Sequence, residues 1–192
     1  MAAVSTRDQI VEIADDLFYR GGFEATSFAD IAAGVGISRG NFYYYFKTKD
    51  EILDAVIDRR IARTRGMLDG WETEAPEPRE RIVAFIELLI ANRAPIMAYG
   101  CPVGTLCAEL AKLDHVHQER AADIFGLFAH WLEKQFRALG ADETAREWAL
   151  HVLAWSQGVA SLATAFKDEV FIRREVADIT GWLDRQIVSL SQ

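Results

Sequence analysis

The sequence predicts an all-α protein of two domains, with three short helices in the N-terminal domain and about nine helices in total. Apolar residues recur every three or four positions along almost the whole chain, which is typical of amphipathic helices. No stretch of useful length alternates apolar and polar residues as a strand would. The chain has 192 residues, of which 51% are hydrophobic, so it can bury a small core and a larger one.

The first helix is predicted to begin at Ser5 or Thr6, because both residue types cap helix N-termini. Gly21 and Gly22 end it. Its apolar side consists of Ile10, Ile13, Ala14, Leu17 and Phe18. This side is expected to face the core of the N-terminal domain.

Two short helices joined by a glycine turn are predicted between Ser27 and Lys49. Ser27 begins the first of them, with Asp30 three residues later in a capping-box pattern. Gly36 stands where the chain turns sharply, which usually needs a positive φ, and Ser38 can cap the second helix. This is the helix-turn-helix pattern, whose second helix lies in the major groove of DNA.

The second of these helices is expected to divide its residues between a core side and a DNA side. The apolar residues expected to face inward are Ile37, Phe42 and Phe46. Arg39 can pair bidentately with guanine, and Asn41 can reach an adenine edge or a phosphate. Gly40 has no side chain, so the backbone there can approach a base closely.

Three consecutive tyrosines follow, and one helix face cannot bury all of them. Tyr43 and Tyr44, with Lys49, are interpreted as phosphate anchors, which set the register of a protein on DNA. The candidate DNA-binding residues are therefore Ser27, Ser38, Arg39, Gly40, Asn41, Tyr43, Tyr44, Tyr45 and Lys49.

The stretch GISRGNFYYYFKTKDEIL resembles the DNA-binding domain of the TetR/AcrR family of bacterial transcriptional repressors. The shared pattern is a glycine-hydrophobic-serine turn, an aromatic run and a K-x-K-[DE]-E-L opening of the next helix. Tyr45 departs from it, since the family often has histidine there. The resemblance implies a C-terminal domain that encloses a small-molecule effector, and a dimer built from the last two long helices.

A fourth helix is predicted to start at Thr48, which forms a capping box with Glu51, and to continue toward Arg65. Arg59, Arg60, Arg63 and Arg65 are expected to end it, where cations complement the helix dipole. We therefore predict a DNA-binding domain over residues 1–65 and an effector-binding and dimerisation domain over residues 66–192. The stretch EAPEP at 74–78 marks the start of the next helix.

The remaining helices follow from apolar spacing, proline and glycine. They are expected at Arg79–Arg93 (ended or bent by Pro95), Pro102–Leu113, Val116–Leu139, from a cap at Asp142 to Phe166, and Phe171–Leu190.

The helix ending at Phe166 has a bulky stripe and a small-residue stripe, which suits one contact with the core and one with a partner chain. The predicted dimer-interface residues are Ala154, Gly158, Ser161, Ala165, Ile179, Leu183 and Ile187. The alternative is that both stripes pack within one chain.

The resemblance also implies an apolar effector cavity. Candidate lining residues are Phe85, Leu89, Tyr99, Cys101, Cys107, Phe125, Phe128, Trp131 and Trp155, and the alternative is that each is an ordinary core residue. Pro102 suits the first position of a helix, which puts Cys101 near its N-cap. Thiolates are favoured at helix N-termini, so Cys101 is either an oxidant or electrophile sensor or a packing thiol.

These features predict a ligand-responsive repressor that binds a palindromic DNA operator as a homodimer. The alternatives are a thiol-sensing repressor and, in a different class, an all-helical binding protein or enzyme without DNA function. No catalytic, cofactor or metal motif is present; His115 and His117 are two residues apart and would not share a helix face. The net charge of −8 lies mostly in residues 66–192, and no apolar run or secretory pattern argues against a cytoplasmic location.

Overall fold

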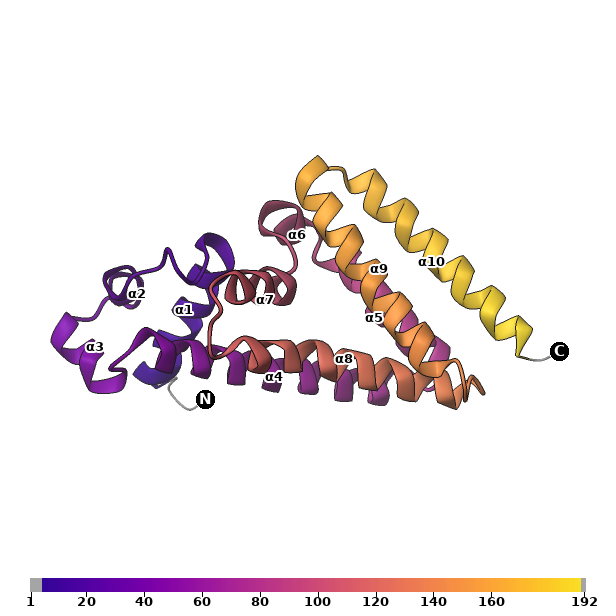
Figure 1. Cartoon of the computed structure of the whole chain (residues 1–192), viewed down its shortest axis with the longest axis horizontal. Helices are drawn as coiled ribbons and strands as arrows, with labels where there is room; N and C mark the ends of the chain where they lie inside the picture. Colours follow the sequence, from indigo (N-terminus) through magenta and orange to yellow (C-terminus); the bar gives the residue numbers. More distant parts are fainter. Residues whose placement is uncertain (1–4, 191–192) are drawn as a thin grey trace. The chain divides into compact units, whose positions relative to one another are not determined.

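The computed structural model describes residues 5–190, which form ten α-helices and no strand (Figure 1). The all-α prediction is confirmed. The helices are α1 (Thr6–Gly21), α2 (Phe28–Val35), α3 (Arg39–Tyr45), α4 (Lys49–Glu74), α5 (Pro78–Ala91), α6 (Arg93–Tyr99), α7 (Pro102–Lys112), α8 (Gln118–Ala138), α9 (Ala145–Phe166) and α10 (Glu169–Ser189).

The chain divides into two compact units. The first runs to Arg63 and also includes Thr105–Asp123, whereas the second comprises Thr64–Gly104 and continues from Ile124. The predicted boundary after residue 65 stays a prediction. What the sequence did not indicate is that the end of α7 and the start of α8 belong to the compact unit that contains α1–α3.

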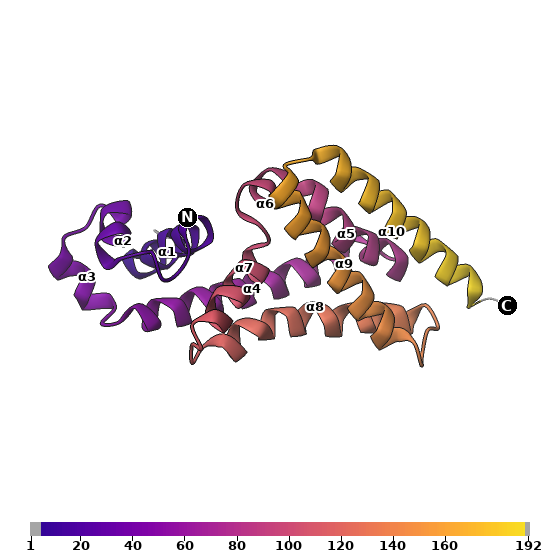
Figure 2. The ribbon, with the colours of Figure 1, turned by 45° about the horizontal axis from the view of Figure 1, so that its top comes forward.

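The first unit, whose helices α1, α2 and α3 lie at the left of Figure 2, has a continuous apolar core. Helices α1–α4, the second half of α7 and the start of α8 contribute to it. Its fully buried side chains include Ile10, Phe23, Ile31, Phe42, Phe46, Ile52, Leu53, Ile57 and Leu110. Burial of this apolar surface is what holds α2 and α3 in place, because helices of 8 and 7 residues are marginal on their own.

Local hydrogen bonds at the predicted caps fix the helix-turn-helix segment. Ser5 and Ser38 cap α1 and α3, and Ser27 and Asp30 form the complete capping box. Gly36 adopts φ 76° and donates its N–H to the carbonyls of α2, while Ile37 N–H bonds to Ala32 O at 3.1 Å. This is a Schellman motif, which requires a left-handed residue at the position of Gly36.

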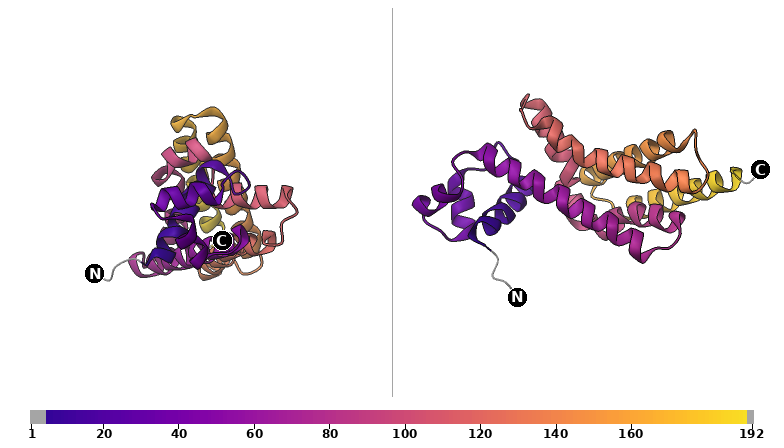
Figure 3. Two further views of the ribbon diagram at one scale, coloured as in Figure 1. Left: turned by 90° about the vertical axis from the view of Figure 1, so that its left-hand side faces the viewer. Right: turned by 90° about the horizontal axis from the view of Figure 1, so that it is seen from below.

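Helix α4 is one continuous helix of 26 residues, seen in purple in the right-hand view of Figure 3. The interpretation of its arginines as C-terminal charges is wrong, because the helix continues to Glu74. Arg60 is instead buried and bonds to Asp15 of α1 at 2.7 Å, while Arg59 pairs with Glu12 at 3.1 Å. Arg59 and Arg60 therefore hold α1 to α4.

The second unit contains α5, α6, α9 and α10 with the adjoining parts of α4, α7 and α8. Helix α9 packs against α5 and α6, and α10 folds back along α9 and also packs on α5 (Figures 1 and 2). The core includes Ile82, Ile86, Leu132, Phe136, Val152, Ile172 and Leu183.

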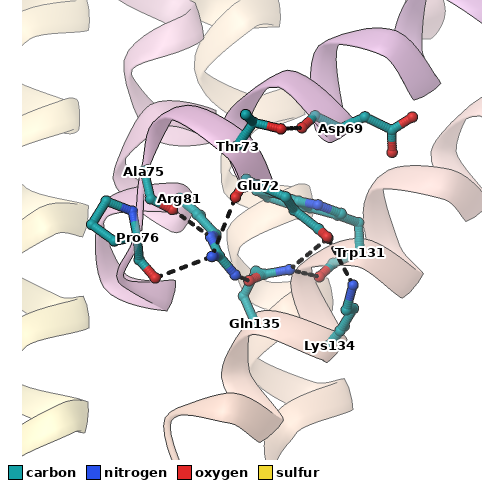
Figure 4. Close-up of polar contacts among 9 residues, drawn as sticks. All are labelled: Asp69, Glu72, Thr73, Ala75, Pro76, Arg81, Trp131, Lys134 and Gln135. Atoms are coloured by element: carbon teal, nitrogen blue, oxygen red, sulfur yellow. Dashed lines mark hydrogen bonds and ion pairs between the residues drawn. The ribbon is translucent and has the colours of Figure 1, made fainter.

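A polar network in this unit joins the end of α4 to α5 and α8 (Figure 4). Arg81 donates to the carbonyls of Ala75 (2.8 Å) and Pro76 (3.1 Å) and to Gln135 Oε1 (3.2 Å). Lys134 Nζ lies 2.9 Å from Glu72 Oε1, and this hydrogen bond lowers the pKa of the Glu72 carboxyl below its ordinary value. The Arg81 guanidinium thereby satisfies carbonyls just after the end of α4, where no further helical turn supplies N–H donors.

Several helix ends differ from the sequence-based expectation. Asp142 does not cap α9, which starts at Ala145 after Thr144 without a side-chain cap bond. Helix α10 starts at Glu169, because Asp168 accepts hydrogen bonds from Val170 N and Phe171 N. Pro95 lies in the first turn of the extra short helix α6, a position where its missing N–H costs nothing.

The two histidines before α8 lie in a loop rather than on a helix. Asp114 has φ 49°, which interrupts the chain between α7 and α8. The rings of His115 and His117 are consequently 5.4 Å apart, although two residues of spacing on a helix would have separated them.

Candidate nucleic-acid interface

Helix α3 buries one side and leaves the other open. Phe42 and Phe46 are each 1% exposed, whereas Tyr44 is 79% and Tyr43 is 45% exposed. The prediction that the apolar residues face inward is confirmed for these phenylalanines. Tyr45 is partly buried against the core of the first unit, so Tyr44 presents most of its side chain to solvent and Tyr43 nearly half.

The start of α3 is also open on its outer side. Asn41 is exposed, and a Cβ added at Gly40 would meet no atom within 4 Å. Ser38 is exposed, and its hydroxyl accepts from Asn41 N at 3.3 Å. The side chain of Arg39 lies outside the described part of the structure, so its predicted contact with guanine stays a prediction.

Aromatic packing orients Tyr43. The ring of Phe28, at the start of α2, packs against those of both Phe42 and Tyr43, with centroids 5.2 Å and 5.6 Å away. Next to these rings is a groove of about 420 Å³ lined by Ser27, Phe28, Ala29, Ala32, Phe42 and Tyr43. The predicted contacts Ser27 and Tyr43 thus border one groove between α2 and α3.

Lys49 is engaged within the protein. Its ammonium donates to the carbonyls of Phe23 (3.1 Å) and Glu24 (3.0 Å) and lies 4.4 Å from the centroid of the Phe23 ring. This arrangement fits a residue that holds the turn before α2. Lys47 is exposed and contacts the carbonyl of Tyr43 through Nζ, at the end of α3.

Two family models match the chain. One, described as bacterial regulatory proteins of the tetR family, covers residues 10–56. The other, described as the C-terminal domain of LmrA/YxaF-like transcriptional regulators, covers residues 78–177. The chain belongs to the TetR family of transcriptional regulators. This is a family of DNA-binding regulators rather than of enzymes, and its DNA-binding model spans α2 and α3.

Individual TetR-family relatives agree with the assignment. An HTH-type transcriptional regulator of the lacX 3′ region of Lactococcus lactis subsp. lactis is 30% identical over 123 residues, 63% of each chain. The HTH-type transcriptional repressor BepR of Brucella suis biovar 1 (strain 1330) is 26% identical over 160 residues, 79% of this chain and 75% of BepR. The match thus spans less than two thirds of the Lactococcus protein.

The fold is shared with solved TetR-family structures. The crystal structure of a TetR transcriptional regulator from Legionella pneumophila superposes with a TM-score of 0.83 at 24% identity. The superposition covers 93% of this chain and 97% of that chain.

The sequence-predicted dimer residues of this TetR-family chain fall into two groups. The small-residue stripe of α9 is exposed throughout: Ala154, Gly158, Ser161 and Ala165. Leu162 and Phe166, 44% and 67% exposed, lie on the same helix. Ile179 and Leu183 of α10 are already buried in the chain's own core, and Ile187 is partly buried against it.

Most of the predicted effector-pocket residues gather in the second unit. Those buried in its core or packed against it are Phe85, Leu89, Cys101, Phe125, Phe128, Trp131 and Trp155. The rings of Phe85 and Phe128 are 5.4 Å apart. Cys107 packs instead against the core of the first unit, and Tyr99 is exposed.

Within residues 5–190, no single helix is both long and apolar enough to cross a membrane. Helix α5 taken together with the segment Arg93–Lys112 meets that test only as a bent pair, by length and composition.

Proposed function

We propose that this chain is a repressor that binds a palindromic operator as a homodimer and releases it when a small molecule occupies the second unit. The observation that carries the proposal is the open side of α3, where Asn41, Tyr43 and Tyr44 are exposed over a fully buried Phe42. Polar and aromatic side chains on the outer face of a recognition helix are suited to base edges and phosphates.

The proposed dimer rests on α9. Its exposed small residues Ala154, Gly158, Ser161 and Ala165 allow a second helix to approach closely, and the exposed Leu162 supplies apolar surface beside them. A two-fold dimer would present two copies of α3 to successive major grooves, about 34–36 Å apart. We leave Ile179 and Leu183 out of the proposed interface, because the chain's own core already buries them.

Substitution of matched glycines tests the dimer. Gly158 of α9 and Gly126 of α8 are both exposed, and an added Cβ meets no atom within 4 Å at either position. Gly158→Arg should convert the dimer to a folded monomer in sedimentation velocity, whereas Gly126→Arg should leave it dimeric. A wild-type chain that sediments as a monomer at micromolar concentration contradicts the proposal.

The proposed effector site lies among the aromatic residues of the second unit. Phe85 and Trp131 are almost fully buried there, while Phe125, Phe128 and Trp155 are partly exposed and adjoin the same core. Aromatic walls of this kind suit a largely apolar ligand. A ligand releases DNA only by its differential affinity for the two states, so we expect a coupling of about 1–3 kcal/mol.

Thiol sensing is the second candidate, favoured by one observation. Cys101 directly precedes α7, and the Gly104 N–H donates to its sulfur at 3.5 Å, as a helix cap does. Neither Cys101 nor Cys107 is in a disulfide. If Cys101 is a sensor, iodoacetamide should label it faster than a free-thiol peptide, and the Cys101→Ser chain should keep its DNA affinity after electrophile treatment.

Selection of DNA fragments by the purified chain tests the function as a whole. Random and genomic fragments are enriched on the protein, and the winning sequence is titrated by fluorescence anisotropy at several salt concentrations. An enriched palindrome is the expected result and supplies the release assay for effectors. No enrichment at low salt, even after the chain has been unfolded and refolded away from any bound ligand, overturns the proposal.

A further inference from the structure

The backbone turn between α1 and α2 is held on one side by a carboxylate. Both oxygens of Glu109 on α7 accept backbone hydrogen bonds, from Phe23 N and from Glu24 N, each at 2.9 Å. Gly22, with φ 92°, makes this approach feasible, because a Cβ there would lie 3.0 Å from Glu109 Oε1. Hydrogen bonds from backbone amides to a carboxylate are stronger than those between neutral groups.

An ammonium holds the same turn through its carbonyls. Lys49, the first residue of α4, donates to Phe23 O and Glu24 O at 3.1 and 3.0 Å. It also lies 3.7 Å from the Glu24 carboxylate. Two consecutive residues, Phe23 and Glu24, are thus held at their N–H groups by a negative charge and at their C=O groups by a positive charge. We call Phe23, Glu24, Lys49 and Glu109 the turn clamp.

Within the turn clamp, Phe23 and Glu24 lie four and three residues before Ser27, the N-cap of α2. Phe23 is 2% exposed and packs edge-on against Phe18 of α1 at 5.2 Å. Thr26 Oγ1 donates to Gly22 O at 2.7 Å, and Ser27 then caps α2. A displacement of Phe23 would therefore move the start of α2 and, through the Gly36 turn, α3.

The segment that carries Glu109 is anchored to α4 and to the core of the first unit. His115 Nε2 lies 3.4 Å from Asp50, and its ring packs edge-on against Phe23 at 5.2 Å. Arg120 bonds to both Asp54 and Asp58 on α4. Leu106 and Leu110, on either side of Glu109 along α7, are buried in the core of the first unit.

We propose that Glu109 is a positioning residue for operator binding: it sets where α2 begins and hence how α3 is presented to DNA. The inference rests on the proposed DNA-binding function and concerns a residue far from the helix-turn-helix in sequence. Glu109 itself touches no base or phosphate in this proposal. Lys49 acts in the same way, in place of the phosphate contact that the sequence predicted.

The direction of the change in operator affinity distinguishes a positioning role of Glu109 from a simple effect of its charge. Removing a carboxylate from a DNA-binding protein should, by general electrostatics, leave DNA affinity unchanged or raise it slightly. Glu109→Gln should instead lower operator affinity about tenfold, because the amide NH₂ cannot accept the second backbone N–H and the turn loosens. Glu119→Gln, which removes the same charge at an exposed position in the same unit, is the matched control.

Salt dependence separates positioning from phosphate contact. Loss of one phosphate contact reduces the slope of log K against log salt by about one. We expect Glu109→Gln and Lys49→Ala to lower affinity at an unchanged slope. Lys49→Ala with a slope reduced by about one would overturn the positioning role of Lys49 and restore it as a phosphate anchor.

Backbone amide chemical shifts and exchange rates measured by NMR test the hydrogen bonds of the turn clamp directly, with or without DNA. In the full-length wild-type chain, the Phe23 and Glu24 amide protons should resonate downfield and exchange slowly with solvent. Glu109→Gln should move both resonances upfield and speed the exchange of both protons. The control Glu119→Gln should change neither the resonances nor the exchange rates. Unchanged amide signals, or unchanged operator affinity in Glu109→Gln, overturn the inference. A wild-type chain that selects no operator is instead a failure of the proposed function, and the amide signals then still decide whether Glu109 holds the turn.

Discussion

Gly40 allows the DNA-facing side of α3 to be tested without damaging the fold. An added Cβ at this position meets no atom of the chain within 4 Å, and Gly40 lies in the first turn of the helix with an ordinary φ. Gly40→Ala therefore removes backbone freedom from the unfolded chain and adds no clash to the folded one. We expect the free energy of unfolding to rise by at most about 1 kcal/mol.

The same methyl group should weaken operator binding. If the outer side of α3 lies in the major groove, the added carbon is forced into a packed interface, where overpacking typically costs about 1–3 kcal/mol. At 1.4 kcal/mol per factor of ten, operator affinity should fall between about fivefold and 150-fold. The variant is thus expected to be more stable and less able to bind DNA, two effects that misfolding cannot produce together.

Gly126→Ala is the matched control for this experiment. Gly126 is exposed on α8 and also has no atom within 4 Å of an added Cβ. It should raise stability by about 0.5–1 kcal/mol with no change in operator affinity. Urea denaturation measures the first quantity, and fluorescence anisotropy with the selected operator measures the second. A Gly40→Ala chain that is stabilised yet binds the operator as tightly as the wild type would show that this part of α3 does not face DNA.

Three further substitutions test the turn before α2, the Glu72 hydrogen bond and the core of the second unit. Gly22→Ala should destabilise the chain by more than about 1 kcal/mol in urea denaturation, because Gly22 has a φ of 92° and an added Cβ would lie close to a Glu109 oxygen. Gly21→Ala, with open space around the added Cβ, should not destabilise it. Equal effects of the two substitutions would contradict this account. Glu72→Gln should lower the free energy of unfolding at neutral pH. In the folded chain the pKa of Glu72 is lowered, chiefly by its hydrogen bond from Lys134. The stability that the Glu72 carboxylate contributes is therefore present above the unfolded pKa of about 4.3 and disappears as the pH falls through the folded pKa. Unfolding curves of the two chains should therefore converge in acid, and a constant difference down to pH 2 would argue for a packing effect. Ile86→Ala, at a fully buried position of α5, should cost about 2–5 kcal/mol in the same urea assay, and a loss below 1 kcal/mol would mean that the core can close around the cavity.

Sequence reasoning located the helix-turn-helix because its signals are local. The Ser27 and Asp30 box, the Gly36 turn and the Ser38 cap each depend on atoms within about four residues, and each is present as predicted. Residue types alone specify such bonds, since the side chain and the amide that it caps are fixed by one turn of helix. The same reasoning failed at Asp142, where a cap residue is present in the sequence but the helix begins after Thr144.

Sequence reasoning missed the partners that are distant along the chain. Lys49 matches the family pattern, which predicts a phosphate anchor, yet its ammonium bonds to carbonyls 25 and 26 residues earlier. Glu109 bonds to Phe23 from 86 residues away, and no spacing rule connects the two positions. The sequence contains only part of the information needed to find this contact. Gly21 and Gly22 mark the end of a helix, but nothing near them indicates that the following N–H groups donate to a carboxylate.

The turn clamp also bears on how an acidic chain can bind DNA. The net charge is −8, yet many acids of the first unit are paired with cations of that unit: Asp15 with Arg60, and Asp54 with Arg120. Helix α3 itself contains no acidic residue. Because the fields of two paired charges largely cancel, and because salt screens charges farther away than a Debye length of about 8–10 Å, a phosphate close to α3 is repelled far less than the net charge suggests. Operator affinity should therefore depend on the short-range geometry of α3, and it is this geometry that Glu109 is proposed to set.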